Sequence, residues 1–155
     1  MAIEVGQKAP AFSLQNTDKA HVSLESFQGK SNVVILFFPL AFSGVCTTEL
    51  CSTRDNISIY EGLDAEILAI SVDSFFTLEA FKKDNRLQFQ LLSDFNKTAS
   101  TDYGTLNEDF FGMHGVSNRA AFVVDKEGVI RYAEVLPQAS DLPNFEAIQE
   151  TLKSL

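Results

Sequence analysis

The chain lacks tryptophan and has few cysteines, prolines and histidines: two, four and two among 155 residues. Two cysteines are too few for a disulfide framework. His21 and His114 stand apart from any metal-ligand spacing, so we interpret both as structural or surface residues. We therefore expect no metal and no other bound cofactor.

Long apolar runs are also missing. The longest one, residues 33–42, contains a proline and is half as long as a membrane-spanning helix, which needs roughly 20 apolar residues. Positive charge is scarce, because 12 lysines and arginines stand against 21 aspartates and glutamates, for a net charge of −9. This balance argues against nucleic acid or a membrane surface as the partner. No secretory signal pattern is visible, so we expect a cytoplasmic location.

Apolar residues, in contrast, are plentiful. They make up 45% of the chain and include 14 phenylalanines. A chain of this length can bury a substantial core, and we expect residues 1–155 to form a single domain. So many phenylalanines also predict an exposed apolar patch at an interface.

Strand-like and helix-like patterns alternate along the chain. The continuous apolar run 33–38 is typical of a central strand buried on both faces. Together with the run 65–72 it predicts a parallel pair joined by a right-handed helical crossover, whereas the turn residues 125–128 predict an antiparallel hairpin. The fold class is thus α/β with a mixed sheet flanked by helices. The predicted strands are 11–15, 21–23, 33–38, 65–72, 120–124 and 129–134, and the predicted helices begin near 44–46, 75, 97 and 143 and end near 60, 85, 103 and 152. We expect Ser74 to cap the second of these helices and a Glu79–Lys83 pair to support it, and Pro143 to lie in the first turn of the last helix.

The most informative segment runs from Phe37 to Cys46. Its apolar strand stops at Pro39, a short turn contains Ser43, and a thiol appears where a helix should begin. The free N–H groups and the dipole of a helix N-terminus stabilise an anion, so this cysteine is biased toward the thiolate, its reactive form. The alternative is an inert buried thiol, because free cysteines are often buried.

The pattern Pro39-x-x-x-Ser43-x-x-Cys46 resembles the active-site signature of the peroxiredoxins, which are thiol-dependent peroxidases with a thioredoxin-like fold. Residues 46–49 continue the match, and residues 118–125 resemble the family's strand with its active-site arginine. Members usually carry threonine where Ser43 stands. The resemblance spans nearly the whole chain and implies a thioredoxin-like fold with an N-terminal β-hairpin.

The resemblance implies a reaction in which a Cys46 thiolate attacks a peroxide and becomes a sulfenic acid. Arg119 is then the guanidinium that stabilises charge during the attack. The alternative for Arg119 is an ordinary surface arginine, and Arg131 on the next strand is a second candidate for the same role. Glu49 is implied to support the geometry of the arginine, while Arg54 lies two helical turns beyond Cys46, too far for contact.

Further residues around the thiol receive roles from the same resemblance. Ser43 hydrogen-bonds the peroxide or the thiolate, although a plain helix N-cap is the alternative. Pro39 shields the thiolate from water. Phe42 and Val45, with Leu40, form apolar walls that admit an organic hydroperoxide without requiring one.

Cys51 decides how the catalytic cycle closes. Its spacing from Cys46 resembles the bacterioferritin-comigratory, or Q-type, branch, in which the second cysteine forms an intramolecular disulfide. Five helical residues span about 8–9 Å between Cα atoms, and a disulfide tolerates about 7 Å, so we predict that this helix opens locally on oxidation. Other segments of the sequence resemble the branch of alkyl hydroperoxide reductase E, in which an external thiol resolves the sulfenic acid. In that case Cys51 would be a small core residue.

Two functions therefore remain open. The first is a peroxidase that uses a thioredoxin-like protein or a low-molecular-weight thiol as reductant and needs no metal, haem or flavin. The second is a thiol-based redox sensor or holdase-type protein with slow turnover. A disulfide oxidoreductase is disfavoured because no C-x-x-C motif is present. By resemblance we expect a homodimer, with a monomer as the alternative.

Overall fold

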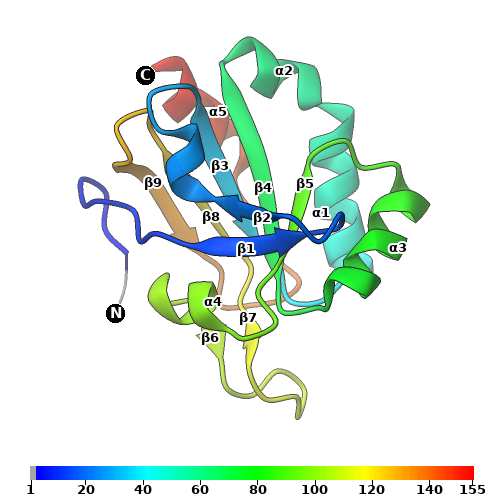
Figure 1. Cartoon of the computed structure of the whole chain (residues 1–155). Coiled ribbons are helices and arrows are strands. Elements are labelled where there is room, and N and C mark those ends of the chain that lie inside the picture. Colours follow the sequence, from blue (N-terminus) through cyan, green and yellow to red (C-terminus); the bar gives the residue numbers. More distant parts are fainter. Residues whose placement is uncertain (1–2) are drawn as a thin grey trace.

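The computed structural model describes residues 3–155, and its centre is a seven-stranded mixed sheet in the order β2-β1-β5-β4-β3-β8-β9 (Figure 1). The strands are β1 (Ser13–Asn16), β2 (His21–Ser23), β3 (Asn32–Phe37), β4 (Ala65–Ser71), β5 (Gln90–Ser93), β8 (Ala120–Val124) and β9 (Ile130–Val135), and a separate pair is formed by β6 (Leu106–Asn107) and β7 (Val116–Ser117). The helices are η1 (Leu24–Phe27), α1 (Gly44–Asp55), α2 (Ile57–Gly62), α3 (Phe75–Asn85), α4 (Thr98–Asp102) and α5 (Phe145–Lys153).

Strand β3 is an inner strand of the sheet and is buried along its whole length. It pairs in parallel with β4 and antiparallel with β8, so that Val34 faces Ile67 on one side and Val123 on the other. Strands β8 and β9 form the predicted antiparallel hairpin. The thioredoxin-like architecture with a mixed sheet and an N-terminal hairpin, β1–β2, is thereby confirmed.

Alternation along the strands divides the core between the two faces of the sheet. Val34 and Leu36 point toward the face covered by α1, α2, α3 and α5. Val33, Ile35 and Phe37 point toward the other face, which the N-terminal hairpin, η1 and α4 cover. The sheet is therefore a central layer with apolar side chains buried on both sides, which explains its nearly continuous hydrophobic strands.

The start of α3 follows local sequence rules. Ser74 caps the helix and its hydroxyl accepts a hydrogen bond from the backbone N–H of Thr77, as predicted. The predicted pair Lys83–Glu79 is present at 3.0 Å. At the end of the chain, the prediction that Pro143 lies in the first turn of the helix was wrong: α5 begins at Phe145, and Asn144 caps it because its side chain accepts the Ala147 N–H.

The prediction of one continuous helix from about 44 to 60 was wrong. The helix is interrupted at Asn56, whose backbone φ is −110°. The side-chain amide of Asn56 donates to the carbonyl of Ser52 at 2.9 Å, and such local hydrogen bonds compete with helix propagation. Helices α1 and α2 are therefore separate pieces.

Three strands were missed by the sequence analysis. β5 contains only two consecutive buried residues, Leu91 and Leu92, between polar ends, which is too short for a clear period. β6 and β7 have two residues each. β5 nevertheless matters, because it joins the N-terminal hairpin to β4 and so extends the sheet.

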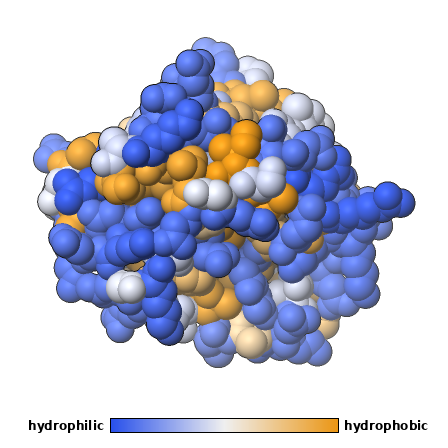
Figure 2. Space-filling model, turned by 90° about the horizontal axis from the view of Figure 1, so that it is seen from above, coloured by the Kyte–Doolittle hydropathy of each residue, from blue (hydrophilic) through white to orange (hydrophobic). Residues whose placement is uncertain are grey.

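The two ends of the sheet differ in character. The C-terminal end of β3 leads into the loop before α1, in the lower half of the molecule in Figure 1. The opposite end is seen from above in Figure 2, where hydrophobic atoms form a patch within a mostly hydrophilic surface. No helix among residues 3–155 has the length and apolarity to cross a membrane.

Candidate active site

Cys46 lies in the first turn of α1 and is completely buried. The loop before it turns sharply: Phe42 has a φ of +69°, a conformation that costs energy for a bulky residue and is often found at functional sites. The Phe42 ring packs on Phe81 of α3, with centroids 5.2 Å apart. The loop is thus held in a conformation that delivers the thiol to the N-terminus of a helix.

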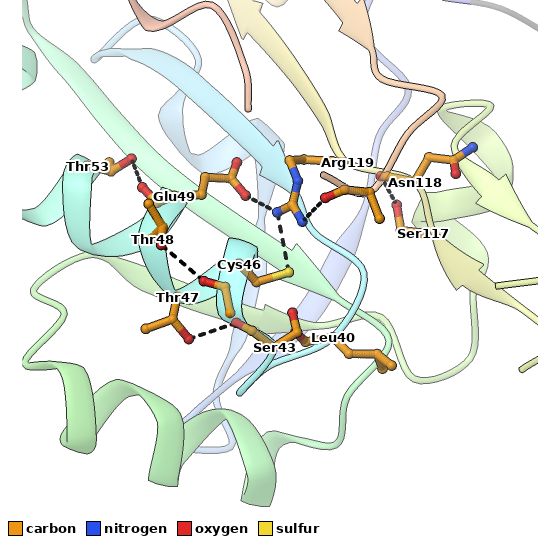
Figure 3. Close-up of polar contacts among 12 residues, drawn as sticks. Leu40, Ser43, Cys46, Thr47, Thr48, Glu49, Thr53, Ser117, Asn118 and Arg119 are labelled. Atoms are coloured by element: carbon orange, nitrogen blue, oxygen red, sulfur yellow. Dashed lines mark hydrogen bonds and ion pairs between the residues drawn. The ribbon is translucent and has the colours of Figure 1, made fainter. Parts of the chain in front are cut away.

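Arg119 reaches the same place from a distant part of the chain. It immediately precedes β8, and the antiparallel register pairs Ala120 with Phe37, the last residue of β3. The start of β8 therefore lies beside the loop that leads to Cys46. Figure 3 shows the result: Arg119 Nη1 donates to Cys46 Sγ at 3.3 Å.

Glu49, one turn after Cys46 on α1, completes the cluster. Its Oε1 lies 2.6 Å from Arg119 Nη1, so a single guanidinium nitrogen contacts both the thiol and the carboxylate (Figure 3). Arg119 Nη2 donates to the backbone carbonyl of Ala139 at 3.0 Å. These three contacts, two from α1 and one from the segment between β9 and α5, fix the guanidinium plane.

The cluster is almost sealed from solvent, with Arg119 2% exposed and Glu49 and Cys46 fully buried. Burial raises the pKa of Glu49 to about 7, although the charge and hydrogen bond of Arg119 oppose this effect. Burial opposes the charge of Arg119, but Glu49 and Cys46 hold its pKa above the ordinary value. Among residues 3–155, Arg119 Nε and Glu49 Oε2 have no hydrogen-bond partner, so the cluster retains one unused donor and one unused acceptor.

Ser43 occupies the N-cap position of α1, but its hydroxyl does not cap the helix. It donates instead to the carbonyl of Leu40 at 2.9 Å (Figure 3). The capping alternative for this side chain is therefore wrong. The hydroxyl bond closes the turn that precedes Cys46.

A hollow of about 190 Å³ lies beside Arg119, and Pro39 forms part of its wall. Val45 is half-buried and Phe42 is 52% exposed, and neither of these predicted substrate contacts lines this hollow. A larger hollow of about 570 Å³ lies elsewhere, near Val33 and Val124 at the other end of the sheet. The hollow that lies beside Arg119 is thus the smaller of the two.

Arg131, the second candidate for the arginine role, is excluded by its position. It lies on β9 near the far end of the β8–β9 hairpin, where its Nε pairs with Asp125 at 2.7 Å. Arg54 donates to the carbonyl of Asn85 at 2.6 Å, in agreement with the expectation that it lies away from the thiol. The position of each arginine along the sheet therefore decides which one reaches Cys46: Arg119 lies beside the end of β3, whereas Arg131 lies near the hairpin turn.

Cys51 has a different environment from Cys46. It is half-buried, and its Sγ lies 3.5 Å from the side-chain oxygen of Asn85 at the end of α3. Both thiols are free, and α1 is continuous between them. In a helix the two positions are rotated by roughly 140°, which is why one faces β8 and the other faces α3.

The sequence analysis predicted one contact of Arg119 in this cluster and missed another. Glu49 was related to the arginine by family resemblance, and the ion pair confirms that expectation. The Ala139 carbonyl was missed, since every residue carries a carbonyl and no side-chain signal marks this one. His21 and His114 are exposed as expected, and no group of three or more potential metal-ligating side chains occurs among residues 3–155.

The family model described as AhpC/TSA family matches residues 5–133. Alkyl hydroperoxide reductase E of Mycobacterium bovis is 40% identical over 135 residues, which is 86% of each chain. Mitochondrial thioredoxin-dependent peroxide reductase of Mus musculus is 34% identical over 159 residues, 96% of this chain and 58% of the mouse protein. The reduced 2-Cys peroxiredoxin of Plasmodium vivax superposes with a TM-score of 0.87 at 29% identity, covering 97% of this chain and 81% of the other.

Proposed function

This chain belongs to the AhpC/TSA family and is a peroxiredoxin, an enzyme of the thiol-dependent peroxidase class, and we propose that it reduces hydrogen peroxide and organic hydroperoxides through a sulfenic acid on Cys46. The single observation that carries the proposal is the 3.3 Å contact between Arg119 Nη1 and Cys46 Sγ at the start of α1. A guanidinium and a helix N-terminus both favour the thiolate, which is the nucleophile.

The proposed reaction is a displacement at oxygen. The Cys46 thiolate attacks the terminal oxygen of the peroxide, a sulfur–oxygen bond forms, and the O–O bond breaks. Sulfur is oxidised by two electrons, the peroxide is reduced by two, and the second oxygen leaves as hydroxide or alkoxide and takes up a proton. Arg119 stabilises the charge that develops on the leaving oxygen because its donors are already oriented by Glu49 and Ala139.

The cycle then closes through Cys51 in our proposal. Its thiol attacks the Cys46 sulfenic acid, a disulfide forms and water leaves. This step requires α1 to open, and the helix is suited to opening, because nine of its twelve residues have lower helix propensity than Leu, Glu or Arg. They are Gly44, Val45, Cys46, Thr47, Thr48, Cys51, Ser52, Thr53 and Asp55.

The hydroxyls of three threonines in α1 add to this weakness. They donate to carbonyls four residues earlier, as Thr48 does to Gly44 at 3.1 Å, and such bonds slightly destabilise and bend helices. If α1 does not open, an external thiol takes the place of Cys51. In either case the proposed reductant is a thioredoxin-like protein or a low-molecular-weight thiol.

We extend the proposal to assembly and location. A homodimer is supported by large exposed apolar side chains, which mark protein interfaces when they gather. Four phenylalanines are among them: Phe42, Phe76, Phe95 and Phe111. A cytoplasmic location is proposed on the basis of the sequence alone.

Intact-mass analysis after one equivalent of hydrogen peroxide tests the catalytic proposal. The parent is expected to lose the mass of two hydrogens, Cys51→Ser to gain one oxygen atom, and Cys46→Ser to remain unchanged. An oxygen that persists in the parent would assign resolution to an external thiol. A parent that reacts once but does not turn over with thioredoxin or a small thiol would favour the redox-sensor alternative, and absence of reaction at Cys46 would refute the peroxidase.

A further inference from the structure

Asp73 lies in the turn between β4 and α3, outside the Cys46 cluster. Strands β3, β4 and β5 run parallel, so the segments that follow them meet at one end of the sheet (Figure 1). At this end the carboxylate Oδ2 of Asp73 accepts the backbone N–H of Ala41 at 2.8 Å. Ala41 belongs to the loop that joins β3 to α1. One carboxylate therefore holds the segment that leads to Cys46.

The Asp73 side chain is itself fixed by the ends of two strands. The hydroxyl of Ser71, the last residue of β4, donates to the same Oδ2 at 2.7 Å and accepts the Asp73 N–H at 3.2 Å. The hydroxyl of Ser93, the last residue of β5, donates to the Asp73 carbonyl at 2.6 Å. Ser71 and Ser93 are partners in the parallel register. The carboxylate is therefore held in one orientation by the sheet.

The two hydrogen bonds to Oδ2 act on the charge of this carboxyl. Burial raises the pKa of Asp73 above its ordinary value, and the hydrogen bonds from Ser71 and Ala41 oppose this effect without cancelling it. Both bonds therefore stabilise the charged form. Hydrogen bonds to an ionised acceptor are about twice as strong as those between neutral groups, so the bond to Ala41 is suited to hold a backbone segment in an unfavourable conformation.

The segment that Asp73 holds is strained. Phe42, the residue after Ala41, has a φ of +69°, and such conformations persist where the surrounding structure enforces them. The hydroxyl bond from Ser43 to Leu40 stays within the loop, so it does not place the loop relative to the sheet. The bond from Ala41 to Asp73 does, because its acceptor belongs to a separate turn that the sheet holds.

We infer that Asp73 is a positioning residue that holds the loop before α1 so that Cys46 meets Arg119. The inference rests on the proposed peroxidase function and adds a residue to its machinery. The 3.3 Å contact between Arg119 Nη1 and Cys46 Sγ joins groups from distant segments, one placed by β8 and the other by this loop. A displacement of about 1 Å in such a site can lower a rate by about 100-fold.

Rapid-quench mass analysis of Cys46 oxidation by hydrogen peroxide tests this role. In Asp73→Ala the Ala41 N–H loses its acceptor, and we expect the second-order rate constant to fall by roughly 10- to 100-fold. Asp73→Asn places an amide oxygen where Oδ2 accepts both bonds, so it should retain most of the parent's rate. A parent-like rate in Asp73→Ala would overturn the inference. So would an equal fall in Asp73→Asn, because the charge and not the bond to Ala41 would then be responsible.

Asp94→Ala is the matched control. Asp94 follows β5, is 1% exposed and accepts the backbone N–H groups of Ala99 and Ser100. Its loss should destabilise the protein, as urea unfolding measures, and leave the bond between Ala41 and Asp73 in place. The oxidation rate of this variant should equal that of the parent. An equal fall in Asp73→Ala and Asp94→Ala would assign the effect to general destabilisation and overturn the inference.

Ser71→Ala decides the question if Asp73→Ala does not fold. It removes the hydroxyl that orients Oδ2 and leaves the carboxylate, so the rate of Cys46 oxidation should fall by a smaller factor. In that case an unchanged rate would overturn the inference. A parent in which no peroxide oxidises Cys46 would instead overturn the proposed function itself.

Discussion

Helix α1 carries two thiols whose surroundings contrast. Cys46 is fully buried against a charged pair, Arg119 and Glu49. Cys51 is more exposed: its Sγ meets the neutral side chain of Asn85 at 3.5 Å, and the charge of Arg54, three residues further along α1, also acts on it. The buried thiol is thus the one that a guanidinium contacts by a hydrogen bond.

The contrast shows that position on the helix decides the chemistry of each thiol. The helix dipole acts within the first turn, which contains Cys46, and fades before Cys51. The rotation of the helix then turns Cys46 toward β8 and Cys51 toward α3. A buried thiol that accepts a hydrogen bond from a guanidinium is suited to attack a small peroxide, and a more accessible thiol is suited to resolve the product.

Replacing Arg119 should have the largest effect on the difference between Cys46 and Cys51. Arg119→Lys keeps the charge but loses the fork that contacts Cys46, Glu49 and Ala139 at once. We expect the second-order rate of Cys46 oxidation by hydrogen peroxide to fall by about 100-fold or more, since loss of one oriented donor has that effect in other enzymes. Stopped-flow measurement of the oxidation step gives this rate directly.

Arg131→Lys is the matched control, because Arg131 lies on the neighbouring strand and pairs with Asp125 instead. Its oxidation rate should equal that of the parent. Equal rates in both variants would mean that the Arg119 contact contributes nothing to the reaction.

The Glu49 carboxyl beside Cys46 should make the stability of the protein depend on pH. The pKa of Glu49 is about 7 in the folded protein, whereas its ordinary value is 4.5. Between pH 4.5 and pH 7 the folded state therefore binds a proton that the unfolded state has released. The free energy of unfolding therefore falls as pH rises through this range. We expect the parent to lose roughly 2 to 3 kcal/mol from this group between pH 5 and pH 8.

Urea unfolding of the reduced protein at the two pH values measures this loss. Glu49→Gln cannot titrate and should show a correspondingly smaller decrease, while Glu66→Gln, an exposed position on β4, should behave as the parent. An identical decrease in parent and Glu49→Gln would contradict the raised pKa.

The smallest expected effect concerns the opening of α1. Thr48 is exposed and donates to the Gly44 carbonyl, and alanine at this position stabilises the helix by up to about 0.7 kcal/mol. Formation of the Cys46–Cys51 disulfide should then slow about three-fold, with the oxidation step unchanged. Rapid-quench mass analysis of disulfide formation provides the measurement.

Thr101→Ala in α4 is the control, since this threonine is also exposed and donates to a carbonyl four residues earlier. It should leave disulfide formation unaffected. If Thr48→Ala also leaves it unaffected, resolution does not require α1 to unwind.

Much of this architecture was predictable because its causes are local. The apolar run of β3, the cap at Ser74 and the turn at 125–128 each depend on a few neighbouring residues, and all three were confirmed. The break at Asn56 was missed because apolar periodicity continues across it. The short strand β5 was missed because two buried leucines do not define a period.

The sequence by itself determined that a thiol follows a buried strand at the start of a helix, since strand, turn and helix signals act over a few residues. Only the tertiary structure decided which arginine meets that thiol, because Arg119 and Arg131 are equally plausible until the register of β8 against β3 brings the first to Cys46. It also decided the Ala139 contact and the hollow beside Arg119, as backbone carbonyls and loop shapes carry no side-chain pattern. Burial, which raises the pKa of Glu49, arises only when distant segments pack together.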